Sequence, residues 1–158
     1  LVLTIPGDNV GHCSGVLLSK DWIISAAQCK EKNLEVIIGR SPPKTGDRRK
    51  IQKTEIFKNS KGEHDIMLLK IDKEAPATLP RVALPDLKTC KAPANQAAVQ
   101  FFAWTGASFN FTLSAALVSA GKLHGVLVNS DIYCENSLEF INICDGEYRK
   151  WILDTTRL

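Results

Sequence analysis

The sequence predicts an all-β, barrel-type domain that is closed by a C-terminal α-helix. Short runs of β-branched and other apolar residues recur along the chain, and Gly, Pro and charged residues separate them. Only the last segment changes to a helical period. With 158 residues, 44% of them hydrophobic, the chain can bury a substantial single core. No apolar run reaches the about 18 residues that a membrane-spanning helix needs.

The first predicted strands, residues 15–19 and 22–26, form a hairpin with Cys13 and Cys29 at its two ends. Residues 75–85 contain three prolines and should be extended but largely unpaired. Tyr148, Trp151 and Ile152 follow a helical spacing, and Asp145 can cap a helix over residues 145–155. Further strands are expected at residues 34–39, 50–57, 65–71, 97–104, 113–119, 122–128 and 138–143, with Gly121 in a tight turn.

The chain contains five cysteines, so at least one of them cannot form a disulfide within the chain. They contain no Cys-x-x-Cys pair and do not lie near a histidine at metal-ligand spacing, so we expect neither a metal site nor a cofactor. Disulfides in an oxidising compartment fit better, with one thiol left over. The acceptor triplet that begins at Asn110 agrees with secretion and glycosylation. The apolar residues 1–6 are too few to form a signal peptide. If the protein is secreted, we expect that its signal peptide was removed and that the numbering begins after the cleavage site.

Positive charge is concentrated between residues 40 and 61, where eight Lys and Arg face two acidic residues. The local charge is therefore +6 in a chain whose net charge is only +3, too little to indicate nucleic-acid binding. One interpretation is a site for a heparin-like polyanion, and the other is an ordinary solvated face. The candidate polyanion-binding residues are Arg40, Lys44, Arg48, Arg49, Lys50 and Lys53.

Four motifs in order resemble the chymotrypsin and trypsin-like serine proteases. They are the hairpin that ends in Ala26-Ala27-Gln28-Cys29, the segment 63–70 around Asp65, the segment 121–126, and the start of the terminal helix at 148–152. The resemblance implies a trypsin-like double β-barrel in a single domain. Because the chain is shorter than such proteases, the second barrel should be truncated between residues 104 and 113. We expect the first barrel at residues 1–85, the shortened second barrel at 86–144, and the terminal helix at 145–158.

The resemblance also implies a pairing of the cysteines. Cys13 and Cys29 match the hairpin disulfide, and Cys90 and Cys144 match a bridge of the trypsin branch. Cys134 matches a cysteine whose usual partner lies in altered sequence. It should therefore be a free thiol or form an intermolecular bond to a protein partner or a second copy. A buried, inert Cys134 is the alternative.

The catalytic residues of the family are degraded in this sequence. Gln28 stands in place of the catalytic histidine, and an amide cannot act as a general base near neutral pH. Asp65 occupies the place of the triad aspartate, where it can accept hydrogen bonds from Gln28 and nearby backbone amides. With a gap of one residue, Ser114 aligns with the nucleophile, and Leu113 and Thr112 replace the aspartate and glycine before it; without a gap, Leu113 takes the place of the nucleophile. The start Leu1-Val2-Leu3 also differs from the activation terminus Ile-Val-Gly-Gly, and a glycan on Asn110 would crowd the site.

We therefore interpret the chain as a secreted, inactive protease homologue that binds a protein partner or an anionic glycan. The alternatives are a hydrolase with residual activity through Ser114 and a gene fragment without an evolved role. Asn129-Ser130 replaces the Trp-Gly that lines the specificity pocket of trypsin, so no substrate preference is expected.

Overall fold

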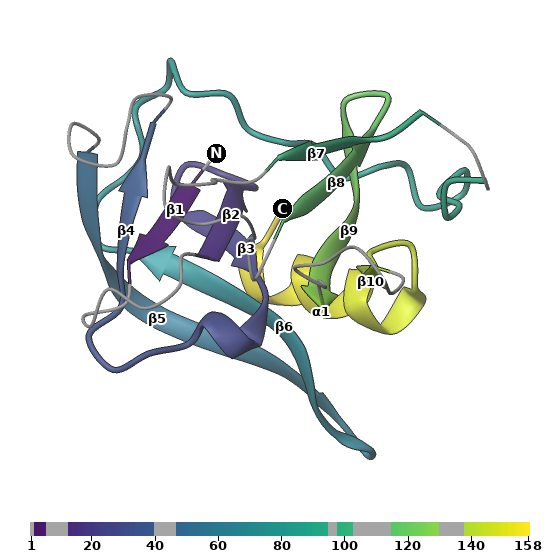
Figure 1. Ribbon diagram of the computed structural model, residues 1–158, viewed down its shortest axis with the longest axis horizontal. Coiled ribbons are helices and arrows are strands. Elements are labelled where there is room, and N and C mark those ends of the chain that lie inside the picture. Colours follow the sequence, from purple (N-terminus) through teal and green to yellow (C-terminus); the bar gives the residue numbers. More distant parts are fainter. Residues whose placement is uncertain (1, 6–12, 40–46, 95–97, 103–114, 130–137) are drawn as a thin grey trace.

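The computed structural model describes residues 2–5, 13–39, 47–94, 98–102, 115–129 and 138–158 (Figure 1). In this part of the chain, strands β1 to β6 close a barrel, and strands β7 to β10 form a separate four-stranded sheet. The terminal helix α1, Gly146–Thr156, follows the sheet. No helix among these residues is long and apolar enough to cross a membrane. The predicted fold class, mostly strands in two parts with a C-terminal helix, is confirmed.

The barrel has the strand order β1-β2-β3-β6-β5-β4. Its strands are β1 Val2–Ile5, β2 Cys13–Leu17, β3 Trp22–Ser25, β4 Glu35–Ile38, β5 Asp47–Asn59 and β6 Gly62–Ile71. The sequence did not predict β1. This strand pairs antiparallel with both β2 and β4, and it thereby closes the barrel.

The hairpin of β2 and β3 is confirmed, and its two strands approach each other closely at Gly15. A Cβ atom at this position would lie 2.9 Å from Cγ2 of Ile23 and 2.9 Å from the carbonyl oxygen of Ile24. Both isoleucines belong to β3 and are at most 1% exposed. Only glycine therefore fits without moving a buried side chain or the backbone of the paired strand.

Strand β6 runs through the centre of the molecule. Its four consecutive residues Ile66, Met67, Leu68 and Leu69 are all fully buried. A strand with one face in solvent would alternate between buried and exposed residues, so both faces of β6 are covered here. This is the reason for the unbroken apolar run in the sequence.

The second sheet has the strand order β10-β9-β8-β7. Its strands are β7 Gln100–Phe102, β8 Ala116–Ser119, β9 Lys122–Asn129 and β10 Glu139–Asn142. Ala120 and Gly121 join β8 to β9 with positive φ angles of 49° and 73°, as a two-residue hairpin turn requires. The tight turn predicted at Gly121 is confirmed.

Helix α1 begins and ends close to its predicted bounds. Its N-cap is Asp145, whose side chain accepts a hydrogen bond from the backbone N–H of Glu147 at 2.9 Å. The helix packs on the barrel through Phe57, whose ring centroid lies 4.7 Å from that of Tyr148 and 5.5 Å from that of Trp151.

The structure contains two disulfides with the expected pairing. Cys13–Cys29 closes the first hairpin, and Cys90–Cys144 links the segment between the barrel and the sheet to the residue before Asp145. Cys134 lies outside the described residues.

Candidate functional site

Gln28, which the sequence predicts in place of the catalytic base, lies on a short 3-10 turn that directly follows β3. Ala26 is extended, and the turn Ala27–Cys29 is closed by a hydrogen bond from the backbone N–H of Lys30 to the carbonyl oxygen of Ala27 at 2.9 Å. Cys29 fixes the end of this turn through its disulfide with Cys13. Buried Ala26 and Cys29 therefore anchor the turn on both sides, while Gln28 is exposed.

Asp65 on β6 lies next to this turn. Its Oδ1 atom accepts a hydrogen bond from the backbone N–H of Gln28 at 2.6 Å, and the backbone N–H of Ala27 also donates to the carboxylate. Burial raises the pKa of the Asp65 carboxyl above its ordinary value, and these two hydrogen bonds lower it by less. Asp65 thus fixes the backbone of the turn.

The side chain of Gln28 extends across to the second sheet. Its Nε2 atom donates to the carbonyl oxygen of Val128 on β9 at 2.5 Å. A contact between residues 28 and 128 therefore joins the barrel to the second sheet. The amide is used as a hydrogen-bond donor here, and it has no atom basic enough to take a proton from a hydroxyl near neutral pH.

Both histidines among the described residues, His64 and His124, have contacts elsewhere. His64 precedes Asp65 on β6, and successive residues of a strand point to opposite faces. Its Nδ1 lies 2.5 Å from the hydroxyl of Tyr148 and its Nε2 lies 3.1 Å from Oδ1 of Asn59, so the ring connects the barrel to α1. His124 on β9 contacts Cys144 instead. His12 lies outside the described residues.

Several predicted site residues also lie outside the described residues. They are Ser114, Asn110, Cys134, Arg40 and Lys44. The residues that directly follow Ser114, Ala115 and Ala116, are buried at 3% exposure, and Ala116 begins β8.

Comparison with known proteins identifies the family to which this geometry belongs. A family model described as Trypsin matches residues 3–148. The chain belongs to the trypsin family. Since the match extends from β1 to the first turn of α1, it includes the barrel, the second sheet and both disulfides.

Similar proteins of known sequence come from snake venoms. Beta-fibrinogenase mucrofibrase-4 of Protobothrops mucrosquamatus is 31% identical over an alignment of 84 residues, and the match covers 44% of this chain and 33% of that protein. Snake venom serine protease homolog rhinocerase 3 of Bitis rhinoceros is also 31% identical over 84 residues, with 44% of this chain and 32% of that protein covered. The matched segment thus spans about a third of the length of these relatives.

Solved structures of trypsin-like proteins have the same fold. Kallikrein-related peptidase 10 superimposes with a TM-score of 0.70 at 20% identity, over 99% of this chain and 94% of that chain. Neuropsin, a serine protease expressed in the limbic system of mouse brain, gives a TM-score of 0.71 at 20% identity, over 98% and 93%.

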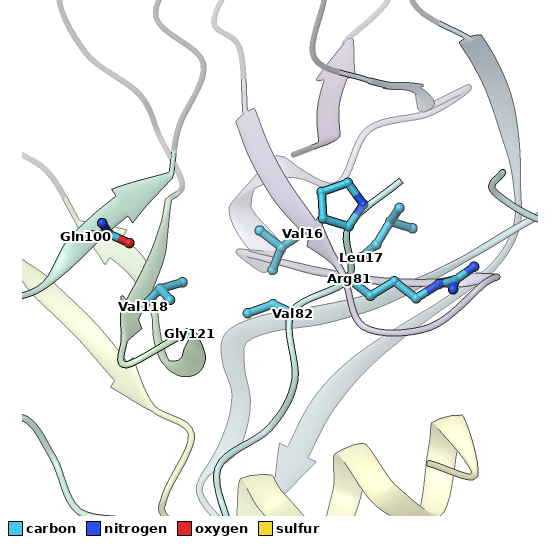
Figure 2. Close-up of a pocket in the computed structure, with 8 residues that line it drawn as sticks. Val16, Leu17, Arg81, Val82, Gln100, Val118 and Gly121 are labelled. Atoms are coloured by element: carbon cyan, nitrogen blue, oxygen red, sulfur yellow. The ribbon is translucent and has the colours of Figure 1, made fainter. Parts of the chain in front are cut away.

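A pocket of about 210 Å³ lies between the barrel and the second sheet of this trypsin-family chain (Figure 2). Val16 and Val82 face Val118 across it, and its described lining residues include neither Gln28 nor Asp65. It is therefore separate from the contact between Gln28 and Asp65.

The described candidate residues of the basic stretch, Arg48, Arg49, Lys50 and Lys53, lie on β5, and three of them have acidic neighbours. Arg48 lies 3.3 Å from Glu35, and Lys53 lies 2.7 Å from Glu55. Arg49 lies 3.6 Å from Asp47, and its side chain is only 14% exposed. Arg49 is therefore poorly placed for an external polyanion, and the candidate surface is smaller than the sequence predicts.

The fold brings one histidine close to the Cys90–Cys144 disulfide, although these residues lie far apart in the sequence. The structure places Nδ1 of His124 at 3.8 Å from Sγ of Cys144. The Sγ atom of Cys90 belongs to the same group, whose ligand atoms all lie within 4.8 Å of one another. His124 is 34 positions from Cys90 and 20 positions from Cys144 in the sequence. Because only the fold brings these residues together, their spacing in the sequence does not predict the contact.

Proposed function

We propose that this chain is a secreted, catalytically inactive member of the trypsin family that acts by binding. The observation that carries the proposal is Gln28, whose amide stands in place of the general base and donates to the carbonyl oxygen of Val128. Without a base, a serine hydroxyl is not deprotonated for attack.

Independent sequence features support the same proposal. In either alignment of Leu113 and Ser114 with the Gly-Asp-Ser-Gly motif, the aspartate before the nucleophile is replaced. Removal of one oxyanion-hole donor alone typically lowers kcat about 10²–10³-fold, so combined losses leave little activity. One of the relatives is itself named a serine protease homolog. Two disulfides agree with an oxidising, extracellular compartment.

A fluorophosphonate probe tests the loss of catalysis. We expect no labelling of the purified, folded protein under conditions in which trypsin reacts fully. Gln28→His should stay unlabelled as well, because the motif around Ser114 is still missing. Labelling of the unsubstituted protein at Ser114 would overturn the proposal and favour a residual hydrolase.

Binding of an anionic glycan would depend on the exposed basic residues of β5, chiefly Arg48, Lys50 and Lys53. Exposed ion pairs such as Arg48–Glu35 contribute little stability, so a polyanion can compete for these cations. We expect Lys50→Ala/Lys53→Ala to leave a heparin column at lower salt than Lys30→Ala/Lys32→Ala, which removes the same charge elsewhere. Equal elution of both variants, or no more retention on heparin than on a plain cation exchanger, would exclude the glycan.

A protein partner, or a second copy of this chain, could be bound covalently through an intermolecular disulfide of Cys134. We expect a disulfide-linked species on non-reducing electrophoresis of secreted material, and Cys134→Ser should abolish it. A monomer with a freely titratable thiol would refute the covalent partner.

A further inference from the structure

The pocket between the barrel and the second sheet combines aliphatic walls with one arginine. Its volume is about 210 Å³, and both halves of the molecule supply part of its lining (Figure 2). We propose that this pocket binds a small amphipathic anion. The apolar body of the ligand, one or two rings in size, would lie between Val82 and Val118, and its carboxylate or sulfonate group would lie at Arg81.

The apolar lining of the pocket comes from three segments: β2 of the barrel, β8 of the second sheet, and the chain between them. The aliphatic residues are Val16, Leu17, Pro80, Val82 and Val118. Leu17 is 1% exposed and Val118 is 5% exposed, so both are packed from behind by the core. Aliphatic side chains offer no hydrogen bond to a water molecule, so a ligand that covers them gains the free energy of burying apolar surface.

Hydrogen bonds hold the two halves of the molecule together around the pocket. The backbone N–H of Val82 donates to the carbonyl oxygen of Leu17 on β2 at 2.9 Å. The carbonyl oxygen of the next residue, Ala83, accepts from the backbone N–H of Leu123 on β9, also at 2.9 Å. Leu123 in turn lies opposite Val118 in the pairing of β8 with β9. The pocket is therefore formed before any ligand binds, as small-molecule sites usually are.

The volume of the pocket sets the size of the ligand. An engineered apolar cavity of about 150 Å³ stays dry and binds benzene. A pocket of about 210 Å³ is larger, so it can take a substituted ring or a body of two rings. Arg81 and Gln100, which also line the pocket, are exposed, so a polar group of the ligand can stay in contact with water.

Charge favours an anion over a cation at this pocket. Arg81 is the one charged residue in its described lining, which contains neither Asp nor Glu. The ion pairs found among the described residues do not include Arg81. The guanidinium of Arg81 extends away from Val118, whereas Gln100 lies on the opposite side of the pocket (Figure 2). An acid group at the outer end of the ligand can therefore accept charge-assisted hydrogen bonds from Arg81.

The test is a titration of the purified, folded chain with three ligands that share one ring system and differ in charge. They are the anion 2-naphthylacetate, the neutral 2-naphthylacetamide and the cation 2-(2-naphthyl)ethylammonium, and calorimetry measures their binding. We expect saturable binding of one naphthylacetate per chain. The amide should bind about 2–5-fold more weakly, which is the effect of an ion pair that stays partly in water, and the cation should bind more weakly still.

Variants locate the bound ligand. Arg81→Gln should bind naphthylacetate and its amide equally, whereas Lys88→Gln, which removes the same charge from the same segment, should keep the preference for the anion. Val82→Phe should abolish binding of all three ligands, because the added ring fills the space between the halves. Leu87→Phe changes an exposed residue outside the described lining and should bind like the unsubstituted protein. Thermal unfolding checks that each variant is folded, and Arg81→Gln tests the site independently of Val82→Phe.

Any of four results would overturn the proposal. They are no saturable binding of naphthylacetate, binding of the cation as tightly as the anion, the same preference for the anion in Arg81→Gln as in Lys88→Gln, and unchanged binding by folded Val82→Phe. Lys50→Ala/Lys53→Ala should bind naphthylacetate normally, and a loss of binding in this variant would place the ligand on β5 instead. None of these results bears on the loss of catalysis at Gln28, which the fluorophosphonate probe tests separately.

Discussion

Gly15→Ala should destabilise the protein strongly, because the structure leaves no room for one methyl group at this position. The new Cβ would lie 2.9 Å from Cγ2 of Ile23 and 2.9 Å from the carbonyl oxygen of Ile24. The carbonyl belongs to the strand that pairs with β2, and the side chain of Ile23 is fully buried. Gly15 also faces Val2 of β1, so β2 is held on both sides.

Overpacking of this kind typically costs about 1–3 kcal/mol. Since neither contact lies at the end of a flexible side chain, we expect the upper part of this range, about 2–3 kcal/mol. For a protein of this length the corresponding fall in the melting temperature is about 4–12 °C.

Urea unfolding measures this effect, with tryptophan fluorescence as the probe. Trp22 is 6% exposed in the same hairpin and reports its opening. Gly146→Ala is the matched control, because a Cβ at Gly146 meets no atom within 4 Å. The control should leave the free energy of unfolding unchanged or raise it by up to about 1 kcal/mol, because alanine loses less backbone entropy on folding than glycine. If Gly15→Ala were as stable as this control at an unchanged m-value, the close approach of β2 and β3 would be refuted.

Three further predictions concern Asp65, the cap of α1, and the contact between α1 and the barrel. Burial raises the pKa of Asp65 above its ordinary value of 3.8. At pH values just above 3.8, the native state therefore binds more protons than the unfolded state. The contribution of this carboxyl to the free energy of unfolding consequently falls as the pH rises through this range. The free energy of unfolding of the unsubstituted protein minus that of Asp65→Asn should therefore decrease with pH there; a difference that rises with pH would contradict the burial. Asp145→Ala should lower the free energy of unfolding by about 0.5–2 kcal/mol, because the N-cap of α1 is lost, and thermal unfolding measures this change. Asp154→Ala, which removes only the exposed ion pair with Lys150, should lower it by less than about 0.5 kcal/mol. Tyr148→Phe should cost about 0.5–1.5 kcal/mol by removing its hydrogen bond to His64, and an unchanged melting temperature would exclude that bond.

The elements that the sequence predicts well depend on local signals. For helix α1, the cap residue and the apolar spacing lie within one short segment of sequence. The cap and the helix bounds predicted from this segment agree with the structure. The hairpin of β2 and β3 and the turn at Gly121 are equally local. Strand β1 shows the limit. Its four residues are stabilised by β2 and β4, whose pairing no short segment of sequence reveals.

The candidate site was predictable to a similar degree. The substitution at Gln28 is visible in the sequence, but its bond to Val128 spans 100 positions and depends on how the sheet sits against the barrel. The meeting of His124 with Cys144 has the same origin. Arg149 is another example, since no local pattern indicates that a cation in the first turn of α1 is 7% exposed.

The way in which the barrel closes has a practical consequence. Val2–Ile5 is a single short strand that occupies the edges of both β2 and β4. If proteolysis removed it, two rows of backbone N–H and C=O groups would become open at once. Such edges pair readily with other chains, so the trimmed protein should aggregate even though it would keep all five cysteines. The integrity of the first residues is therefore the first property to verify in any preparation of this protein.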